Sequence, residues 1–203
     1  ALHYLPLTLA EQLGYFKAEG LDVDILDMSS GEAAAQAVVS GSAQVGAGDF
    51  DQLLAWQALG QMCQSFVLLA RAPGVAFGVS PHALPAYRTL TDLNGRRIGM
   101  SAPEAPGHRM ARLMLARAGL GASDVSYVSL ASMDQAVVAF RLGQVHALSH
   151  GDPVMTMLEQ KGDVRIISDT RTLKGTAEVF GGPMPAACLY APLEFIRKNP
   201  NTC

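Results

Sequence analysis

The chain has 203 residues, of which 49% are hydrophobic and 16% charged, with 15 basic and 18 acidic side chains. A charged share below the roughly 25% of an average soluble domain excludes a disordered chain, and the length allows one domain or two small ones. The nearly balanced charge provides no basic surface for nucleic acid or for an anionic membrane.

The cysteines do not indicate disulfides or a metal site, and the apolar segments do not indicate a membrane span. The three cysteines are an odd number without paired spacing, so we expect buried free thiols rather than disulfides or a zinc site. The longest apolar stretch, 66–79, is interrupted by Arg71, Pro73 and Gly74, so we expect no membrane-spanning segment. Residue 1 already lies in a folded-looking segment, and we expect any export signal to lie outside this sequence.

The first part of the chain alternates helices and strands. Apolar residues at helical spacing predict a helix over 7–16, and strict alternation predicts a strand over 21–26. Ser30 is a candidate N-cap for a helix that ends at Gly41. The elements expected next are a strand at 43–47, a helix at 49–59 capped by Asp49, and strands at 65–70 and 75–79.

A loop rich in proline and small polar residues, 80–92, separates this part from a second alternating run. The run is expected to contain strands at 97–100, 125–130, 145–148 and 164–167, and helices at 108–118, 133–142 and 153–161. A second break at 181–185 precedes a strand at 186–190 and a helix from Pro192. Strands and helices that alternate in this way predict an α/β fold with mostly parallel sheets.

One pattern occurs twice in the chain. A Gln-Ala-Val-Val helix, a glycine and a short strand lead to Gly48-Asp49, and the same order leads from 135–138 to Gly151-Asp152. The repeat predicts two similar lobes. Each lobe then has an aspartate at a helix N-terminus beside the carboxyl end of a strand, where open α/β sheets bind ligands.

The two breaks bracket the second run, so we expect the chain to cross from lobe one to lobe two and to return. The predicted division is lobe one at 1–80, a crossover at 81–91, lobe two at 92–180 and the return to lobe one at 181–203. Two linkers between the lobes would form a hinge, which suits closure around a small molecule.

An ordered series of short strings runs along nearly the whole chain. They are LPL at 5–7, GYFKAEGLDVDI at 14–25, SGSAQVG at 40–46, DLNGRRIG at 92–99, AGL at 118–120, GQVHA at 143–147 and DP at 152–153. The series resembles the periplasmic solute-binding proteins of ABC importers in the nitrate, sulfonate and taurine group, which also includes binders of thiamine-pyrimidine precursors.

This resemblance implies a two-lobed fold of the type II periplasmic-binding-protein class, with the ligand cleft between the lobes. It implies a small-molecule solute and a membrane permease as partners, no cofactor, a monomer, and a periplasmic or lipid-anchored location. Family members normally have a strand before the position of Ala1 and more chain after Asn199-Pro200. The sequence is therefore expected to be a fragment that lacks the first strand and the C-terminal part of lobe one.

The loop after the strand at 97–100 departs from the family pattern, which is often a Gly-Ser-Ser run that cradles an anion on backbone amides. Here Pro103 and Pro106 remove amide donors, and Glu104 adds negative charge where an oxyanion would sit. We therefore expect a ligand with a donor or cationic group, or an uncharged heteroaromatic, in preference to a sulfonate or nitrate.

The resemblance also implies a set of ligand-binding residues at strand ends and helix N-termini. They are Tyr4, Leu5, Ser29, Ser30, Gly31, Gly48, Asp49 and Phe50 in lobe one, and Ala102, Glu104, Gly107, His108, His150 and Asp152 in lobe two.

Several of these residues also have a purely structural interpretation, which the sequence leaves open. Tyr4 either contacts a ligand or packs on the surface, and Ser30 and Asp49 either contact a ligand or only cap their helices. Glu104 either accepts a hydrogen bond from a ligand or is solvated. His108 opens a helix, whose dipole favours the neutral imidazole.

Two other function classes stay open at this point. An enzyme on the same fold, as in the related pyrimidine-synthesis proteins, would hold pyridoxal phosphate through a lysine and carry a cysteine-rich motif. The predicted cleft loops contain no lysine and the cysteines do not cluster, so we expect no catalytic residue. His146 and His150 need not share a face, so we expect no metal site. A ligand-sensing domain of a regulator is not distinguished from a transport protein by the sequence.

Overall fold

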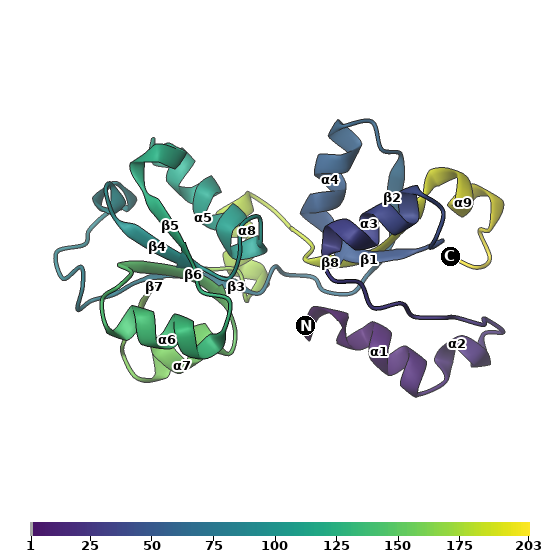
Figure 1. The fold of residues 1–203 in the computed structure, drawn as a ribbon, viewed down its shortest axis with the longest axis horizontal. Coiled ribbons are helices and arrows are strands. Elements are labelled where there is room, and N and C mark those ends of the chain that lie inside the picture. The colour runs from purple at the N-terminus through teal and green to yellow at the C-terminus, as the bar shows by residue number, and fades with distance from the viewer. Residues whose placement is uncertain (1) are drawn as a thin grey trace. The chain divides into compact units, whose positions relative to one another are not determined.

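The computed structural model describes residues 2–203, which form two compact units, each described by itself below (Figure 1). Unit 1 comprises the chain up to Ala72 together with Met184–Cys203, and unit 2 comprises Pro73–Pro183. The chain therefore leaves unit 1, forms unit 2 and returns, as the two breaks in the sequence predict. Among the described residues, no helix is long and apolar enough to cross a membrane.

Unit 1 contains a three-stranded sheet in the order β1-β8-β2. The strands are β1 (Gly46–Asp49), β2 (Cys63–Leu68) and β8 (Ala187–Pro192), and β8 runs antiparallel to both neighbours. Two helices, α3 (Gly31–Val39) and α4 (Phe50–Ala58), cover the sheet. The core between helices and sheet consists of Val38, Leu53, Cys63, Cys188 and Tyr190.

Tyr190 needs glycine on the neighbouring strand. A Cβ atom built at Gly46 would lie 2.3 Å from the Tyr190 ring, and one at Gly48 would lie 3.1 Å from it. The ring of Trp56 meets the Tyr190 ring edge-on, with 5.5 Å between the centroids. The two glycines of β1 therefore let the large aromatic ring lie against the strand.

The N-terminal part of unit 1 differs from the prediction. The helix expected over 7–16 is broken into α1 (Leu5–Gln12) and α2 (Tyr15–Ala18), after η1 (Leu2–Tyr4), because Gly14 adopts a left-handed conformation with φ 73°. The strand expected over 21–26 is absent, and its apolar residues Val23 and Leu26 are exposed. A strand requires backbone pairing with a neighbour, and this segment pairs with neither edge of the sheet. The unit ends with α9 (Leu193–Lys198).

Unit 2 contains a five-stranded sheet in the order β5-β4-β6-β3-β7. The strands are β3 (Val75–Val79), β4 (Arg97–Met100), β5 (Ser126–Ser129), β6 (Ala147–Gly151) and β7 (Arg165–Asp169). β4 is parallel to β5 and β6, whereas β3 is antiparallel to β6 and β7. Four of the five strands thus point the same way.

Helices cover both faces of this sheet (Figure 1). They are α5 (Pro106–Arg117), α6 (Met133–Arg141), α7 (Val154–Gln160) and α8 (Leu173–Phe180), and short 3-10 helices lie at η2 (Leu90–Leu93) and η3 (Ala122–Asp124). Side chains of α5 and α8 pack in one core cluster and those of α6 and α7 in another. Ala147 of β6 belongs to the first cluster and Leu148 to the second, as alternation along a strand requires.

The α/β fold is confirmed, but the mostly parallel sheets expected from the sequence are not found. Among the described strands, both pairings in unit 1 are antiparallel, as are two of the four in unit 2, because β8 and β3 each run against both of their neighbours. Two further details differ from the prediction. The segment 75–79 was expected in lobe one, but it is the strand β3 and pairs with β6 and β7, so the boundary lies at Ala72–Pro73. The sequence analysis did not include α8, which begins after the N-cap Thr172 and ends at the left-handed Gly181. In each sheet the reversed strand, β8 or β3, is the one that follows a crossover between units.

Candidate functional site

Three of the lobe-one candidates, Gly48, Asp49 and Phe50, lie at the edge of the sheet of unit 1 where β1 ends. Asp49 pairs with Ala187 and Gly48 with Cys188, so the carboxyl end of β1 lies beside the start of β8. Burial and the nearby negative charges of Asp49 and the Cys188 thiolate raise the pKa of Tyr4 to about 12. The structure thus brings Tyr4 close to Asp49.

Asp49 stands at the N-cap position of α4, but its side chain makes no capping hydrogen bond. The next residue, Phe50, is half-buried against the core of unit 1, and its amide donates to the carbonyl of Ala186 at 2.8 Å. This hydrogen bond ties the start of α4 to the segment that returns from unit 2.

The start of α3 is a second part of the same unit that carries candidates. Ser30 caps α3, because its hydroxyl oxygen accepts from the amide of Ala33 at 3.1 Å, which confirms the predicted cap and leaves the hydroxyl proton available. A Cβ atom at Gly31 would lie 3.0 Å from Oε1 of Gln52, so α3 begins beside the first turn of α4. Ser29 is exposed, as is Leu5 at the start of α1. Gln52 was missed by the sequence analysis, and only this contact identifies it.

In unit 2 the candidates lie at the ends of the parallel neighbours β4 and β6: in the loop after β4, in the first turn of α5, in the last part of β6 and directly after it. The parallel pairing of β4 with β6 places their carboxyl ends at one edge. Gly107 packs directly on β6, since a Cβ atom there would lie 2.5 Å from the carbonyl oxygen of Ser149. The buried Ser149 hydroxyl donates to the Gly107 carbonyl at 2.7 Å. Ala102 is exposed on the loop before α5.

His108 is buried and its tautomer is fixed by its surroundings. Its Nδ1 accepts a hydrogen bond from the amide of Glu104 at 3.0 Å, so in the neutral ring the proton is on Nε2. Burial lowers the pKa of His108, which favours this neutral form, although the negative Glu104 acts in the opposite direction. The ring meets Tyr127 edge-on, with 4.5 Å between the centroids.

Glu104 does not present an unpaired negative charge, contrary to the expectation from the sequence. Its Oε1 lies 2.9 Å from Nη1 of Arg112, and Arg109 donates to its carbonyl oxygen. Its backbone has φ 57°, a left-handed conformation that non-glycine residues rarely adopt. The carboxylate is thus held among positive groups rather than free to repel an anion.

His150 lies near the carboxyl end of β6 and Asp152 directly follows that strand, and the two have different surroundings. Nδ1 of His150 lies 3.1 Å from the carbonyl oxygen of Gly151 and must donate to it, which leaves Nε2 as an acceptor in the neutral ring. Nε2 is buried and has no hydrogen-bond partner among the described residues. Oδ1 of Asp152 accepts from the amide and hydroxyl of Thr156, at 3.0 and 2.8 Å.

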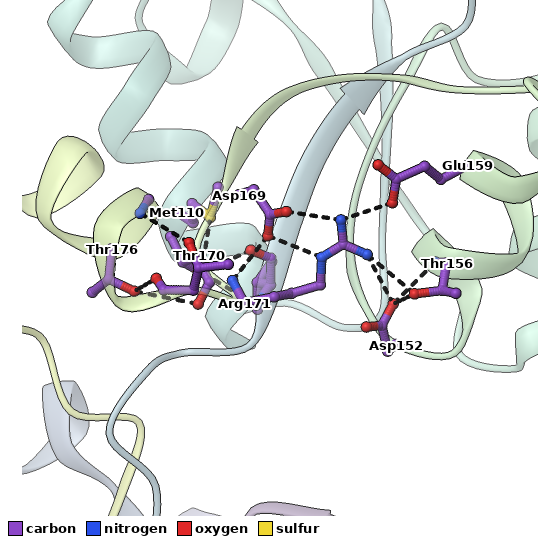
Figure 2. A network of polar contacts seen from close by, with 11 residues as sticks. Met110, Asp152, Thr156, Glu159, Asp169, Thr170, Arg171 and Thr176 are labelled. Atoms are coloured by element: carbon purple, nitrogen blue, oxygen red, sulfur yellow. Dashed lines mark hydrogen bonds and ion pairs between the residues drawn. The ribbon is translucent and has the colours of Figure 1, made fainter.

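Arg171 connects the ends of β6 and β7 with α7 (Figure 2). Its guanidinium donates to both carboxylate oxygens of Asp169, at 2.9 and 2.8 Å, to Glu159 at 2.9 Å and to Asp152 at 3.3 Å. These bonds raise the pKa of Arg171 and lower that of Asp169. The sequence analysis missed this arginine, and its only sequence signal is the position directly after a strand end.

A groove of about 460 Å³ lies on unit 2 beside α5. Its walls combine charged, aromatic and apolar side chains: Glu104, Arg109, Arg112, Leu113, Leu115, Leu120 and Tyr127, with small residues between them. Among the described residues, Glu104 is the one candidate that lines this groove. The groove is therefore distinct from the carboxyl end of β6, where His150 and Asp152 lie. No group of three or more metal-binding side chains occurs among the described residues.

Solved structures share the fold. A protein of Bordetella bronchiseptica RB50 is 52% identical, with a TM-score of 0.80 over 99% of this chain. The periplasmic aliphatic sulphonate binding protein SsuA of Escherichia coli is 21% identical, with a TM-score of 0.70 over 98% of the chain. The periplasmic nitrate-binding protein NrtA of Synechocystis PCC 6803 is 16% identical, with a TM-score of 0.64 over 99% of the chain.

The chain spans 63%, 65% and 55% of the lengths of these three proteins, respectively. At 21% and 16% identity, the latter two show the periplasmic-binding-protein fold alone. No curated protein sequence matches the chain. The model of the family described as NMT1/THI5 like matches residues 2–200. The chain therefore belongs to the NMT1/THI5-like family, as the resemblance in its sequence predicts.

Proposed function

We propose that the chain is part of the solute-binding component of an ABC importer, which captures a small molecule between two hinged lobes and delivers it to a membrane permease. The observation that carries the proposal is the position of the crossovers. In each unit, a segment that joins the units ends at the sheet edge that carries candidate residues. Ala187, the first residue of β8, pairs with Asp49 at the end of β1, and Val75, the first residue of β3, pairs with Gly151 at the end of β6.

This arrangement suits a binding protein that closes on its ligand. A hinge at the edges that carry the polar groups lets a small rotation bring both sets of groups onto one solute. The solute shifts the equilibrium towards the closed form because it contacts both lobes only there. Of the proteins with solved structures described above, SsuA is named for sulphonate binding and NrtA for nitrate binding. A periplasmic or lipid-anchored location for this protein follows from the same proposal.

The polar groups at these edges favour a solute with hydrogen-bond donors. In unit 1, Asp49 places a carboxylate at the carboxyl end of β1. In unit 2, Nε2 of His150 is buried without a hydrogen-bond partner among the described residues, while Nδ1 donates to Gly151. A buried polar atom without a partner is costly, and a donor group of a ligand would satisfy it. We therefore propose an amine, an amide or a heteroaromatic with an N–H group as the class of solute.

The test is recovery of the bound solute from the complete gene product. The protein is incubated with a mixture of sulfonates, carboxylates, pyrimidines and amines, washed and denatured, and the released molecules are identified by mass spectrometry. One unaltered N–H-bearing solute supports the proposal, whereas an altered molecule indicates an enzyme and an oxyanion overturns the proposed solute class.

Variants then locate the site. Asp49→Asn and His150→Phe should each weaken binding of the recovered solute at least about tenfold, the effect of one lost charged or buried hydrogen bond. The exposed Asp22 is in unit 1 and away from the strand ends, so Asp22→Asn is the matched control. Unchanged affinity in both site variants would remove these residues from the site.

A further inference from the structure

We propose that Glu104 is a resident carboxylate that occupies an anion-binding cradle on unit 2, so that removing it opens the cradle to free organic anions. The cradle is defined here by Arg109, Arg112 and the groove beside α5, which both arginines line. How an occupied cradle affects the choice of solute rests on the proposed function. Whether Glu104 occupies the cradle is a property of unit 2 alone and can be measured independently.

The contacts of Glu104 are those expected of a bound anion. Its Oε1 lies 2.9 Å from Nη1 of Arg112. Its amide donates to His108 and its carbonyl accepts from Arg109, so the backbone of the residue is also held on both sides. Glu104 thus joins two arginines of α5, and the neutral His108 accepts from its amide.

The backbone of Glu104 points to a constraint that a solvated loop residue does not need. With φ 57°, Glu104 is the sole non-glycine residue of positive φ among residues 2–203. A residue with a Cβ atom adopts this conformation at a cost in free energy, and glycine does not have this cost. The hydrogen bonds to His108, Arg109 and Arg112 hold the residue in this conformation.

The groove beside the cradle has the size and lining of a small-molecule site. Its volume of about 460 Å³ falls in the range of roughly 300–1,000 Å³ that small-molecule sites occupy. Arg109, Arg112 and Glu104 lie on its wall together with the apolar Leu113 and Leu120. An organic acid could place its charged group on Arg112 and its hydrocarbon part against the leucines. The chemical class of ligand is therefore a carboxylate or sulfonate with a short apolar tail.

Glu104 is a competitor that is attached to the chain. The Arg112–Glu104 pair is half-exposed, with side-chain exposures of 51% and 63%, so it is weak enough to be displaced. A tethered carboxylate nevertheless acts at a high effective concentration, and a free anion must compete with it. The displaced Glu104 would also repel the incoming anion. Removal of the glutamate side chain should therefore strengthen anion binding.

The experiment compares two substitutions of Glu104 in the complete chain. Glu104→Gly suits a positive φ and empties the cradle, whereas Glu104→Gln removes the charge but keeps the cradle filled. Calorimetric titration uses hexanoate as the probe, with hexylammonium and hexanol as probes of opposite and zero charge. The matched control is Glu178→Gln, which makes the same charge change on an exposed helical position of unit 2.

The expected result is that Glu104→Gly binds hexanoate more tightly than the wild type by up to about fivefold, the scale set by loss of an exposed ion pair. Glu104→Gln should show a smaller gain, and hexylammonium and hexanol none. In Glu104→Gly the pKa of His108, followed by NMR, should fall because the nearby negative charge is lost, and hexanoate should restore it.

Three outcomes would overturn the proposal. No gain in hexanoate binding by Glu104→Gly would show that the cradle does not exist. An equal gain in Glu178→Gln would show a general effect of net charge, and an equal gain in Glu104→Gln would show loss of repulsion rather than an emptied position. None of these outcomes bears on the solute recovered from the complete protein, so the two proposals fail separately.

Discussion

Replacement of Arg171 by glutamine should destabilise unit 2 through the loss of one positive charge shared by three carboxylates. The guanidinium is 16% exposed and binds Asp169 with two hydrogen bonds, at 2.9 and 2.8 Å, and Glu159 with one at 2.9 Å. Asp152 lies 3.3 Å away on the remaining side. Glutamine is neutral and too short to reach all three carboxylates. The carboxylates of Asp169, Glu159 and Asp152 would therefore face one another without a positive charge between them.

The magnitude follows from the burial of the partners. Loss of one member of a buried ion pair costs about 3–5 kcal/mol, because the other charge stays buried. Here Asp169 and Glu159 are 32% and 47% exposed, so water can solvate them in part. We therefore expect a loss of about 2–3 kcal/mol in the free energy of unfolding. For a chain of this length that corresponds to a fall of about 4–12 °C in Tm.

Urea unfolding followed by circular dichroism measures this loss. Fluorescence of Trp56, the single tryptophan, reports on unit 1 and separates its transition from that of unit 2. Arg171→Lys is the control that keeps the charge. A single ammonium group cannot reproduce the bidentate contact with Asp169, so this variant should be intermediate.

The pH dependence provides the decisive check. Hydrogen bonds from Arg171 lower the pKa of Asp169 below its usual 3.8, so the stabilisation is present above this value and is lost as the pH falls through the lower, folded-state pKa. The difference between wild type and Arg171→Gln should therefore be constant from pH 5 to 7 and shrink below about pH 4. A difference that does not shrink in acid, or a variant as stable as the wild type at pH 7, would refute the electrostatic explanation.

Other substitutions test the packing and the buried polar groups. Gly175→Ala should cost more than about 3 kcal/mol, measured by urea unfolding, because its Cβ would lie 1.8 Å from the carbonyl oxygen of Asp169. Tyr190→Phe should raise the free energy of unfolding by about 1 kcal/mol, since the buried hydroxyl has no partner among the described residues; a loss of stability would contradict this. Burial lowers the pKa values of His108 and His146, so stability should be full above pH 6.5 and decrease as the pH falls through the folded-state values. Variants with glutamine at both positions should lose this dependence in unfolding experiments between pH 5 and 8.

Local signals in the sequence were sufficient where the structure is determined by local contacts. Ser30 was predicted as a cap from its type and position, and its side chain does accept from the amide three residues on. The glycine at position 41 was predicted to end α3, and it follows the last residues of that helix with φ 80°. Both features depend on residues within one helical turn, so no knowledge of the tertiary structure was needed.

Features that depend on distant pairing were not predictable in the same way. The segment 21–26 has the alternation of a strand, yet a strand forms only where a neighbour offers its backbone, and none does here. Arg171 is adjacent to Asp169 in sequence but meets Glu159 and Asp152 only through the fold. Glu104 was predicted to add negative charge to its loop. In the structure it forms an ion pair with Arg112, which is 8 residues away in the sequence. The pattern of charges in the sequence could not identify these partners.

The direction of one strand in each sheet explains why the crossovers lie at the candidate edges. A strand parallel to its neighbours would begin at the opposite edge from their carboxyl ends. Because β3 is antiparallel to β6, its first residue Val75 lies opposite Gly151, at the carboxyl end of β6. Because β8 is antiparallel to β1, its first residue Ala187 lies opposite Asp49. Each unit is therefore entered at the edge that carries its polar candidates, so the linkers that would act as the hinge are attached next to the groups that would hold the solute.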